Sequence, residues 1–550
     1  MYFTEHANTS MIPPNEFQES HAMNVPQIFF STSALAPVVL MATVALLTRV
    51  DRFSTAGVWR MFQIISGGAL ALTIIFVCAG PTSSHWPSVL QTSTFGLILA
   101  LLVQLLGTII GGFSSRYLQG EMGQKGFVAA LATVLAGVHL LLMADHWLVL
   151  ILAWDLVGVA VQHLLCFYTD RAFAQLAAHK KRIADRLADG LLLIAAVLAW
   201  VDVGSGSLSA LWAHIAREGM STSLHLSALA LVLAVVLRTA LLPVHGWLIQ
   251  VMEAPTPVSA LLHAGVVNLG GFVLIRFAPL LEQSTPARAL LLVFGLSTAV
   301  LAGMVMLTRI SIKVRLAWST VAQMGFMLLE CALGLYTLAA LHLIGHSLYK
   351  AHAFLSSSTV VRQTRLQALH RPSVPTAFSL VLAPVLTISV VLLMHSLVEH
   401  APWPWWWCVV LGLAWAPLLW LRPVGGLPAH LGQALFGLLI VIGLTTGTML
   451  AHALPLDIQD NPHQNLGLIA LLGMVALYFW VALLQLRPSL FSTWRRWSYA
   501  GFYLDEAYTR MALQFSPSRW MHESLKSTSP QAVTSSLTDV RAEVSNRRTS

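Results

Sequence analysis

The sequence predicts an all-α polytopic membrane protein, and two observations support this fold class. The first is composition: of the 550 residues, 57% are hydrophobic and only 10% are charged, with a mean hydropathy of +0.73, whereas soluble domains carry roughly 25% charged residues. The second is a series of apolar runs of about 18 residues or more, each long enough to cross a bilayer as a helix. They predict about 15 transmembrane helices, the first near residues 27–48 and the last near 465–486.

Lysine and arginine are unevenly distributed among the connecting segments, which predicts the orientation in the membrane. Residues 1–48 contain neither, whereas arginines follow the first apolar run at 49–60 and basic residues cluster again at 171–186. Alternate connections are nearly free of them. We therefore predict a multi-pass protein of the bacterial inner membrane, with the N-terminus outside and the C-terminus in the cytoplasm. The net charge of +8 reflects this topology, and no nucleic-acid partner is indicated.

Motifs for cofactors, metals or covalent catalysis are absent from the sequence. The cysteines lie in apolar runs without CxxC spacing, and no phosphate-binding Gly-rich loop, GxSxG or HExxH occurs. We therefore expect no catalytic residue, metal or cofactor in this chain, and a role in transport or energy coupling in a membrane rather than an enzyme.

The segment HLIGHSLYKAH at 342–352 places protonatable residues within an apolar helix, where charge is costly and usually functional. His342, His346 and Lys350 are spaced four apart, which puts them on one stripe of a helix with about 6 Å of rise per step. Such a row can pass protons through intervening waters. The alternative is that the histidines only form hydrogen bonds to neighbouring helices.

A second group combines acidic residues with an arginine. Asp155 lies in the middle of one apolar run, Asp189 near the start of the next, and Arg238 in a third, five residues before Pro243. Because proline lacks an N–H donor, we predict a helix break at Pro243, and broken helices inside a membrane protein often form ion sites. We predict that Asp155 pairs with Arg238. A purely structural ion pair is the alternative.

Two further positions follow from the same reasoning. In EAPTPVSALLHAG (253–265) the prolines suit the start of a helix, and His263 lies between the Arg238 region and the Lys350 row, which favours a bridging role over that of a core histidine. Pro384 predicts another helix break.

EAPTPVSALLHAGVVNLGGFVLIR (253–276), SIKVRLAWSTVAQMGFM (311–327) and the HLIGHSLYKA row resemble the antiporter-like membrane subunits of respiratory complex I and Mrp antiporters. The similarity covers roughly residues 90–365. It implies two inverted five-helix repeats, at 126–280 and 288–421, each with a half-channel and a broken helix. The remaining segments are then an external segment 1–26, transmembrane helices at 27–125 and 422–486, and a cytoplasmic tail 487–550 with an amphipathic part and a disordered end.

The resemblance also implies roles along a proton or cation pathway for Asp155, Asp189, Arg238, His263, Lys313 and Lys350. With His342 and His346 of the row, these are the candidate pathway residues. Two positions depart from the family pattern. Arg238 stands where a lysine is usual, and since arginine stays protonated it can bias a carboxylate but not carry a proton. The helix with Pro384 has no lysine or glutamate after the proline, and His395 is its nearest titratable group.

The short bundle and the amphipathic segment GFYLDEAYTRMALQF (501–515) resemble DabB-type membrane subunits of inorganic-carbon uptake complexes. This implies a DabA-type cytoplasmic partner, similar to a zinc-dependent β-carbonic anhydrase, in which any CO2 hydration and the zinc reside. The candidate docking residues are Phe502, Tyr503, Asp505 and Tyr508. Anchoring of this segment on membrane lipid is the alternative.

The function expected from these observations is conduction of protons or another cation, coupled to a carbon-hydrating partner. One alternative is an antiporter-like proton-pumping subunit of a respiratory NADH-quinone oxidoreductase or an Mrp-type complex. Another is a non-conducting membrane anchor, which would tolerate neutralisation of Asp155 and Lys350.

Overall fold

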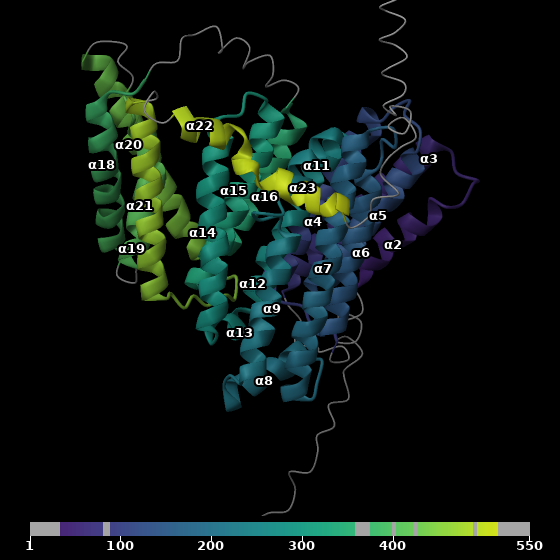
Figure 1. The fold of residues 1–550 in the computed structure, drawn as a ribbon. Helices are drawn as coiled ribbons and strands as arrows, with labels where there is room; N and C mark the ends of the chain where they lie inside the picture. Colours follow the sequence, from purple (N-terminus) through teal and green to yellow (C-terminus); the bar gives the residue numbers. More distant parts are fainter. Residues whose placement is uncertain are drawn as a thin grey trace, which may run out of the picture.

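The computed structural model describes residues 34–80, 89–357, 374–398, 403–421, 427–487 and 492–514, whose regular elements are all helices. Most of these helices run side by side along one direction (Figure 1). Ten are long and apolar enough to cross a membrane, and three shorter apolar helices accompany them. The all-α membrane fold is confirmed, while the number of about 15 spans is not. The predicted external segment 1–26 and residues 515–550 of the tail lie outside the described residues.

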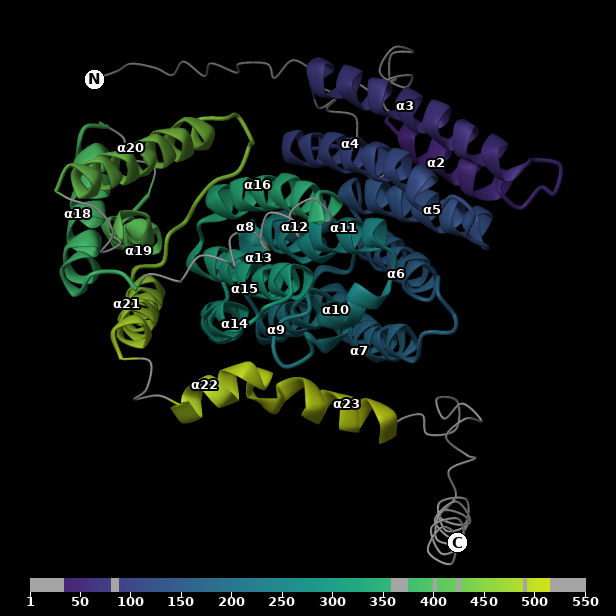
Figure 2. The same cartoon turned by 90° about the horizontal axis from the view of Figure 1, so that it is seen from above.

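The first group of helices lies at one side of the bundle (Figure 2). It consists of α2 (Ala36–Leu47), α3 (Thr55–Ala79), α4 (Thr94–Tyr117) and α5 (Gln124–Leu142). Serine side chains begin two of these helices: Ser54 accepts from the Gly57 N–H and Ser93 from the Gly96 N–H, each at 3.1 Å. Such caps satisfy backbone donors that have no partner inside the helix.

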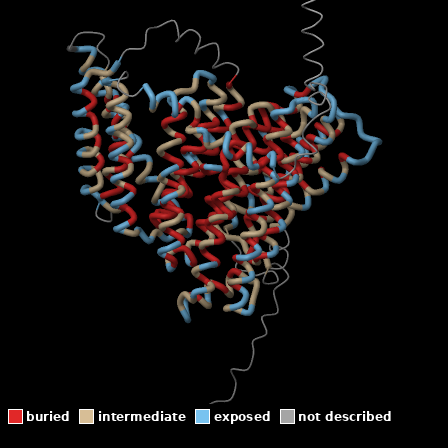
Figure 3. Tube along the Cα trace, viewed as in Figure 1, coloured by how far each residue is buried: buried red, intermediate tan, exposed pale blue. Residues whose placement is uncertain are grey.

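The middle group contains most of the buried ionisable residues. The hydrophobic core extends through it from the first group of helices to the last ones (Figure 3). Its helices are α6 (Trp147–Leu165), α7 (Ala172–Val203), α8 (Leu208–Glu218), α9 (Thr222–Arg238), α10 (Gly246–Gln250), α11 (Thr256–Ala264), α12 (Leu269–Arg276), α13 (Ala278–Glu282), α14 (Thr285–Leu307), α15 (Ile312–Leu333) and α16 (Tyr336–Leu355), with short 3-10 turns η1 (Val251–Glu253) and η2 (Val266–Asn268). Close packing explains part of the burial: a side chain at Gly325 of α15 would lie 2.6 Å from the Ala299 nitrogen of α14, so only glycine permits this approach.

Two apolar segments in this group are interrupted. The chain is not helical from 239 to 245, between α9 and α10, and this stretch includes Pro243. The Leu242 N–H there donates to Thr298 Oγ1 of α14 at 3.3 Å, in place of a helical bond. Between α11 and α12, Asn268 Nδ2 donates to Ala264 O at 3.0 Å and to Ser347 Oγ of α16 at 2.7 Å. Both interruptions are therefore closed by side chains within the protein, as non-helical backbone at membrane depth requires.

A third group lies at the opposite side of the bundle (Figure 2). It comprises α18 (Ala377–Ser396), α19 (Trp405–Trp415), the turn η3 (Ala416–Leu419), α20 (Leu427–His452) and α21 (Gln464–Leu486). The predicted break at Pro384 is wrong, because α18 continues through the proline. Pro384 removes the donor to the Leu380 carbonyl, and the Tyr478 hydroxyl of α21 donates to that carbonyl instead, at 2.8 Å.

We expect Tyr478→Phe to lower the free energy of unfolding by about 1 kcal/mol, because the Leu380 carbonyl then loses its replacement donor. The measurement is the heat-unfolding midpoint of the purified chain in detergent. In a Pro384→Ala background, a backbone N–H can donate to the Leu380 carbonyl. Tyr478→Phe should therefore lower the free energy of unfolding by less in that background. The bond from Trp420 Nε1 to the Tyr478 hydroxyl is lost in both backgrounds and cancels. An equal loss of unfolding free energy in the two backgrounds would contradict the role of Tyr478 as the replacement donor.

The final elements run along one flank of the bundle and link the middle group at α14 and α15 to α7 (Figures 1 and 2). They are α22 (Ser492–Tyr499), η4 (Gly501–Tyr503) and α23 (Leu504–Gln514), and we call residues 492–514 the strap. The Arg309 guanidinium, just after α14, lies 5.6 Å from the centre of the Tyr499 ring. The strap thus holds together helices that are far apart in the sequence.

Candidate functional site: two clusters of buried ionisable residues

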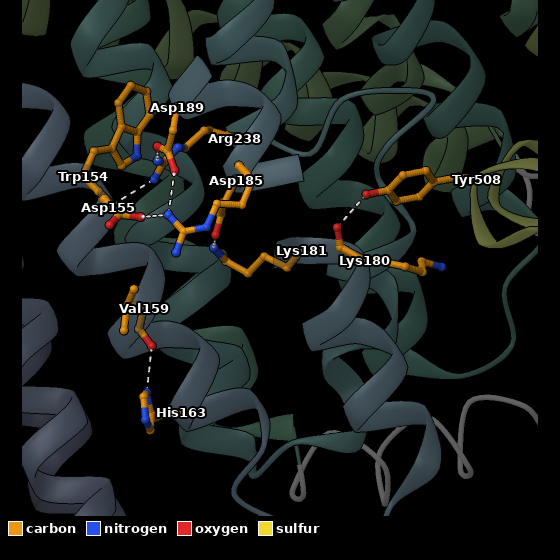
Figure 4. A network of polar contacts seen from close by, with 11 residues as sticks. Trp154, Asp155, Val159, His163, Lys180, Lys181, Asp185, Asp189, Arg238 and Tyr508 are labelled. Carbon is orange, nitrogen blue, oxygen red and sulfur yellow. Dashed lines mark hydrogen bonds and ion pairs between the residues drawn. The ribbon is translucent and has the colours of Figure 1, made fainter. Parts of the chain in front are cut away.

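The first cluster is built around Arg238, the last residue of α9 (Figure 4). Its guanidinium forms an ion pair with Asp189 of α7 and donates to the Trp154 carbonyl of α6 at 2.8 Å. It also lies over the Trp154 ring, 5.1 Å from the centroid. Arg238 is 6% exposed, so its charge is neutralised within the bundle at the point where the helix breaks.

The predicted pairing of Arg238 with Asp155 is wrong. The Trp154 ring faces Arg238, and the next side chain along a helix points about 100° further round. Asp155 therefore meets Arg186 of α7 instead, at 3.5 Å, and Arg186 is also 3.6 Å from Asp189. Asp155 remains linked to the cluster, but through a more exposed arginine.

Two lysines of α7 extend this cluster toward the strap (Figure 4). Lys181 is buried, forms an ion pair with Asp185 one turn later, and lies 5.3 Å from the centre of the Trp247 ring of α10. Lys180 is also buried and forms an ion pair of 2.5 Å with Asp505 of α23. A series of ion pairs thus lies along α7 and ends at the strap. In the sequence, Lys180 and Lys181 resemble loop charges, and only their burial shows that they belong to this cluster.

The second cluster is centred on Lys350 of α16, which is 1% exposed. Its ammonium donates to the Leu316 carbonyl of α15 at 2.9 Å and to the Ser319 hydroxyl. No carboxylate lies within ion-pair distance of Lys350 in the described part of the chain. A buried amine held by neutral oxygens can release a proton more readily than one in an ion pair, because no negative charge stabilises its ammonium form.

His346 and His342 continue from Lys350 along α16. Both ring nitrogens of the buried His346 lack a hydrogen-bond partner among the described protein atoms. The His342 and His346 rings lie 6.1 Å apart. A pocket of about 480 Å³ adjoins the row and is lined by Ser319, Gln323, His342, Gly345, His346, Tyr349 and Lys350. The row therefore has both the groups and the space that a water-mediated relay needs.

His263 and Lys313 occupy different positions relative to this row. His263 of α11 is fully buried and its ring stacks on Phe354 of α16, with centroids 4.6 Å apart. It thus contacts the helix of Lys350, whereas no contact joins it to Arg238 among the described residues. Lys313, at the start of α15, donates to Thr256 Oγ1 at 2.9 Å and lies at the end of the bundle.

Glu330 of α15 is a buried carboxylate that the sequence analysis did not identify. Its Oε2 lies 2.9 Å from His342 Nδ1, which adds an acid to the row. Glu330 is the one charged residue between 320 and 335. Because a charge within an apolar membrane helix is costly and usually functional, the sequence alone could have identified it as a candidate. Its partner His342 lies 12 residues away on the next helix. Helical periodicity within one segment therefore does not predict this pair.

Two of the four candidate docking residues in the strap contact the chain itself, and the prediction that Tyr508 lines a partner surface is wrong because Tyr508 is buried. Asp505 pairs with Lys180, and a side chain at Gly246 of α10 would lie 1.4 Å from Asp505 Oδ1. Tyr508 is 3% exposed and donates to the Lys180 carbonyl at 2.6 Å. Burial raises the pKa of Tyr508, which keeps its hydroxyl a donor. Phe502 contacts Trp494 within the strap, and Tyr503 is exposed.

The chain is similar to known membrane proteins over much of its length. Residues 144–402, which contain most of both clusters, match the family described as NADH:quinone oxidoreductase/Mrp antiporter, TM. The chain is also similar to a solved structure of the Mrp complex from Dietzia sp. DQ12-45-1b, with a TM-score of 0.54 and 20% identity over 95% of this chain. It spans 60% of the length of that Mrp chain, and this likeness concerns the fold alone.

Similarity in sequence to other relatives is higher. The chain is 37% identical to the probable inorganic carbon transporter subunit DabB of Hydrogenovibrio crunogenus, over 80% of this chain and 85% of the relative. It is 38% identical to subunit DabB2 of Halothiobacillus neapolitanus, over 78% and 81%. NADH-quinone oxidoreductase subunit L of Mycobacterium tuberculosis is 30% identical over 50% of this chain. With its antiporter-like fold and its coverage of these relatives, the chain belongs to the DabB family of membrane subunits.

Proposed function

We propose that this chain is the proton-conducting, or other cation-conducting, membrane subunit of an inorganic-carbon uptake complex. Membership of the DabB family supports the transport role. The observation that most strongly supports ion conduction is the row of Lys350, His346 and His342 inside the bundle, next to a pocket. A passive anchor does not need such groups at membrane depth, where they cost free energy.

In this proposal the first cluster forms one half-channel, within residues 126–280. Arg238 stays protonated and acts as a fixed positive charge beside Asp189. The groups that exchange protons are then Asp189, Asp155 and Lys181, close to the interruption that follows Arg238. The second half-channel, within residues 288–421, uses the Lys350 row, with His263 as the link between the halves and Lys313 at one end.

Orientation and partner complete the proposal. The N-terminus lies outside the bacterial inner membrane and the C-terminus in the cytoplasm, as the basic connecting segments favour. A cytoplasmic partner similar to a zinc-dependent β-carbonic anhydrase hydrates CO2, and this chain supplies ion flux rather than catalytic groups. The alternative of a respiratory or Mrp-type subunit differs in its partners. Purifying the tagged chain from its natural membrane and identifying the co-purifying proteins tests this: quinone-oxidoreductase subunits would overturn the proposal.

The tail is proposed to contribute to docking of this partner, and deletions can locate the contact. Deleting residues 495–550 should weaken co-purification of the partner while the bundle still inserts, because the apolar spans and their basic connections all precede the cut. Recovery of the partner is normalised to the amount of chain in the membrane. Undiminished recovery would leave the tail as a membrane anchor and move the docking site to the connection before α7.

Two controls separate the strap from the last residues of the tail. Deleting only residues 515–550 keeps the strap, so a full loss with this shorter deletion would place docking beyond the strap. Asp505→Asn removes the charge that pairs with Lys180 and keeps the rest of the tail. This variant reports whether weaker docking in the longer deletion comes only from the loss of that ion pair.

A further inference from the structure

Glu330 occupies an unusual position for an ionisable residue. It lies three residues before the end of α15 and is 4% exposed, in the otherwise uncharged stretch 320–335. Its carboxylate meets His342 at 2.9 Å. A carboxylate buried at membrane depth is costly unless a function or a strong partner retains it. A histidine that exchanges protons is a weak structural partner for a charge, since the pair is ionic only while the imidazole is protonated.

Glu330 stands at the far end of the row from Lys350. Lys350 contacts Leu316 and Ser319 near the start of α15, and 14 residues of helix, about 21 Å, separate Leu316 from Glu330. Along α16, His342 and Lys350 are eight residues, or about 12 Å, apart. The row therefore runs along the two helices toward the turn between α15 and α16, and Glu330 is its last member before that turn.

A further pair of titratable groups lies at this turn. The connection between α20 and α21 packs on it, with the Asn461 N–H donating to the Gly334 carbonyl at 2.9 Å. In the same connection, Asp460 accepts from the Thr337 N–H at 2.7 Å and lies 3.6 Å from His452 Nε2. Burial raises the pKa of Asp460, so this carboxyl can take up a proton more readily than an exposed one. His452 is partly exposed and leads to the surface.

The route expected from related subunits, through the helix of Pro384, lacks corresponding groups. α18 is continuous, and its only titratable side chain, His395, is bonded to the Trp403 carbonyl at 2.7 Å. The structure thus offers protonatable groups at the turn between α15 and α16 and none that continue the row through α18 within the described residues.

We propose that Glu330 is the terminal proton acceptor of the Lys350 row, and that protons leave the row at the α15–α16 turn by way of Asp460 and His452. In the transfer step, protonated His342 gives its Nδ1 proton to Glu330 Oε2, which forms a neutral imidazole and a carboxylic acid. The acid then passes the proton through water to the carboxylate of Asp460. This inference rests on the proposed function, because it assigns an exit to the same relay.

The test compares four variants at the chain's own chromosomal locus, where the natural partners are present: Glu330→Gln, Glu330→Asp, Lys350→Ala and Glu282→Gln. Uptake of labelled inorganic carbon is measured per amount of chain in the membrane. Glutamine keeps the size of Glu330 and an acceptor for His342 but cannot take up a proton. We expect Glu330→Gln to lower uptake by at least about 100-fold, and Glu330→Asp to retain more uptake than Glu330→Gln. Glu282, at the same end of the bundle and bonded to Asn461 at 3.2 Å, is outside the row, and its variant should be normal.

The possible results distinguish a wrong exit at Glu330 from a wrong proposal for the relay as a whole. Normal uptake in Glu330→Gln with loss in Lys350→Ala would overturn the role of Glu330 and leave the proposed function standing. Normal uptake in both would overturn the proposed function itself. If Glu330→Gln is active and Glu330→Asp is not, Glu330 serves packing or hydrogen bonding, and the inference fails.

Discussion

Lys350→Ala is expected to reduce inorganic-carbon uptake to the background of cells that lack the chain, while the chain still inserts and assembles. The variant removes the only amine of the row, and the relay then has no proton donor between His346 and Ser319. Truncation leaves no charge unpaired, since Lys350 is held by the Leu316 carbonyl and the Ser319 hydroxyl. The measurement is uptake of labelled inorganic carbon, with the amount of chain and of complex in the membrane determined in parallel.

Lys350→Arg is the matched control for charge. Arginine keeps a positive charge and donors for Leu316 and Ser319, but it does not release its proton. Loss of uptake in both variants, at normal assembly, would show that deprotonation at this position is required. Full uptake with arginine would mean that charge alone suffices, and full uptake with alanine would contradict the relay.

The features predicted correctly from the sequence are those set by local periodicity. Apolar runs long enough to span a bilayer predict the all-α membrane fold, and the four-residue spacing of His342, His346 and Lys350 places them together on α16. The structure confirms the fold class. It also shows the rings of His342 and His346 near each other and next to the pocket that Lys350 lines, although their role in conduction stays a proposal.

The features that the sequence could not predict depend on contacts between distant segments. Pro384 removes a helical donor, but whether the helix breaks depends on Tyr478, 98 residues after the carbonyl that it serves. The choice of Asp189 over Asp155 as the partner of Arg238 depends on how α6 is rotated about its axis, which the sequence of α6 alone does not determine. The close approach of Asp505 to Gly246 of α10 likewise requires the strap to cross the flank, and amphipathicity predicts only that it has an apolar side.

Arg238→Met is expected to destabilise the chain by about 3 kcal/mol or to force Asp189 to protonate, because it removes the buried partner of Asp189 and leaves only the exposed Arg186, at 3.6 Å, beside it. Arg238→Lys should be tolerated better, since the ammonium keeps the positive charge beside Asp189. It also restores a group that can exchange protons. The measurements are the heat-unfolding midpoint of the purified complex and uptake of labelled inorganic carbon.

A second substitution separates stability from conduction. Asp189→Asn in the Arg238→Met background removes the unpaired charge, so the unfolding midpoint should recover while uptake stays low if the pair serves the ion path. Recovery of both would instead make the pair a structural tie between α7 and α9. Equal loss in Arg238→Lys and Arg238→Met would contradict the role of charge, because lysine preserves it. The deciding feature would then be the guanidinium geometry, which contacts Asp189 and the Trp154 carbonyl at once and which a single ammonium cannot reproduce.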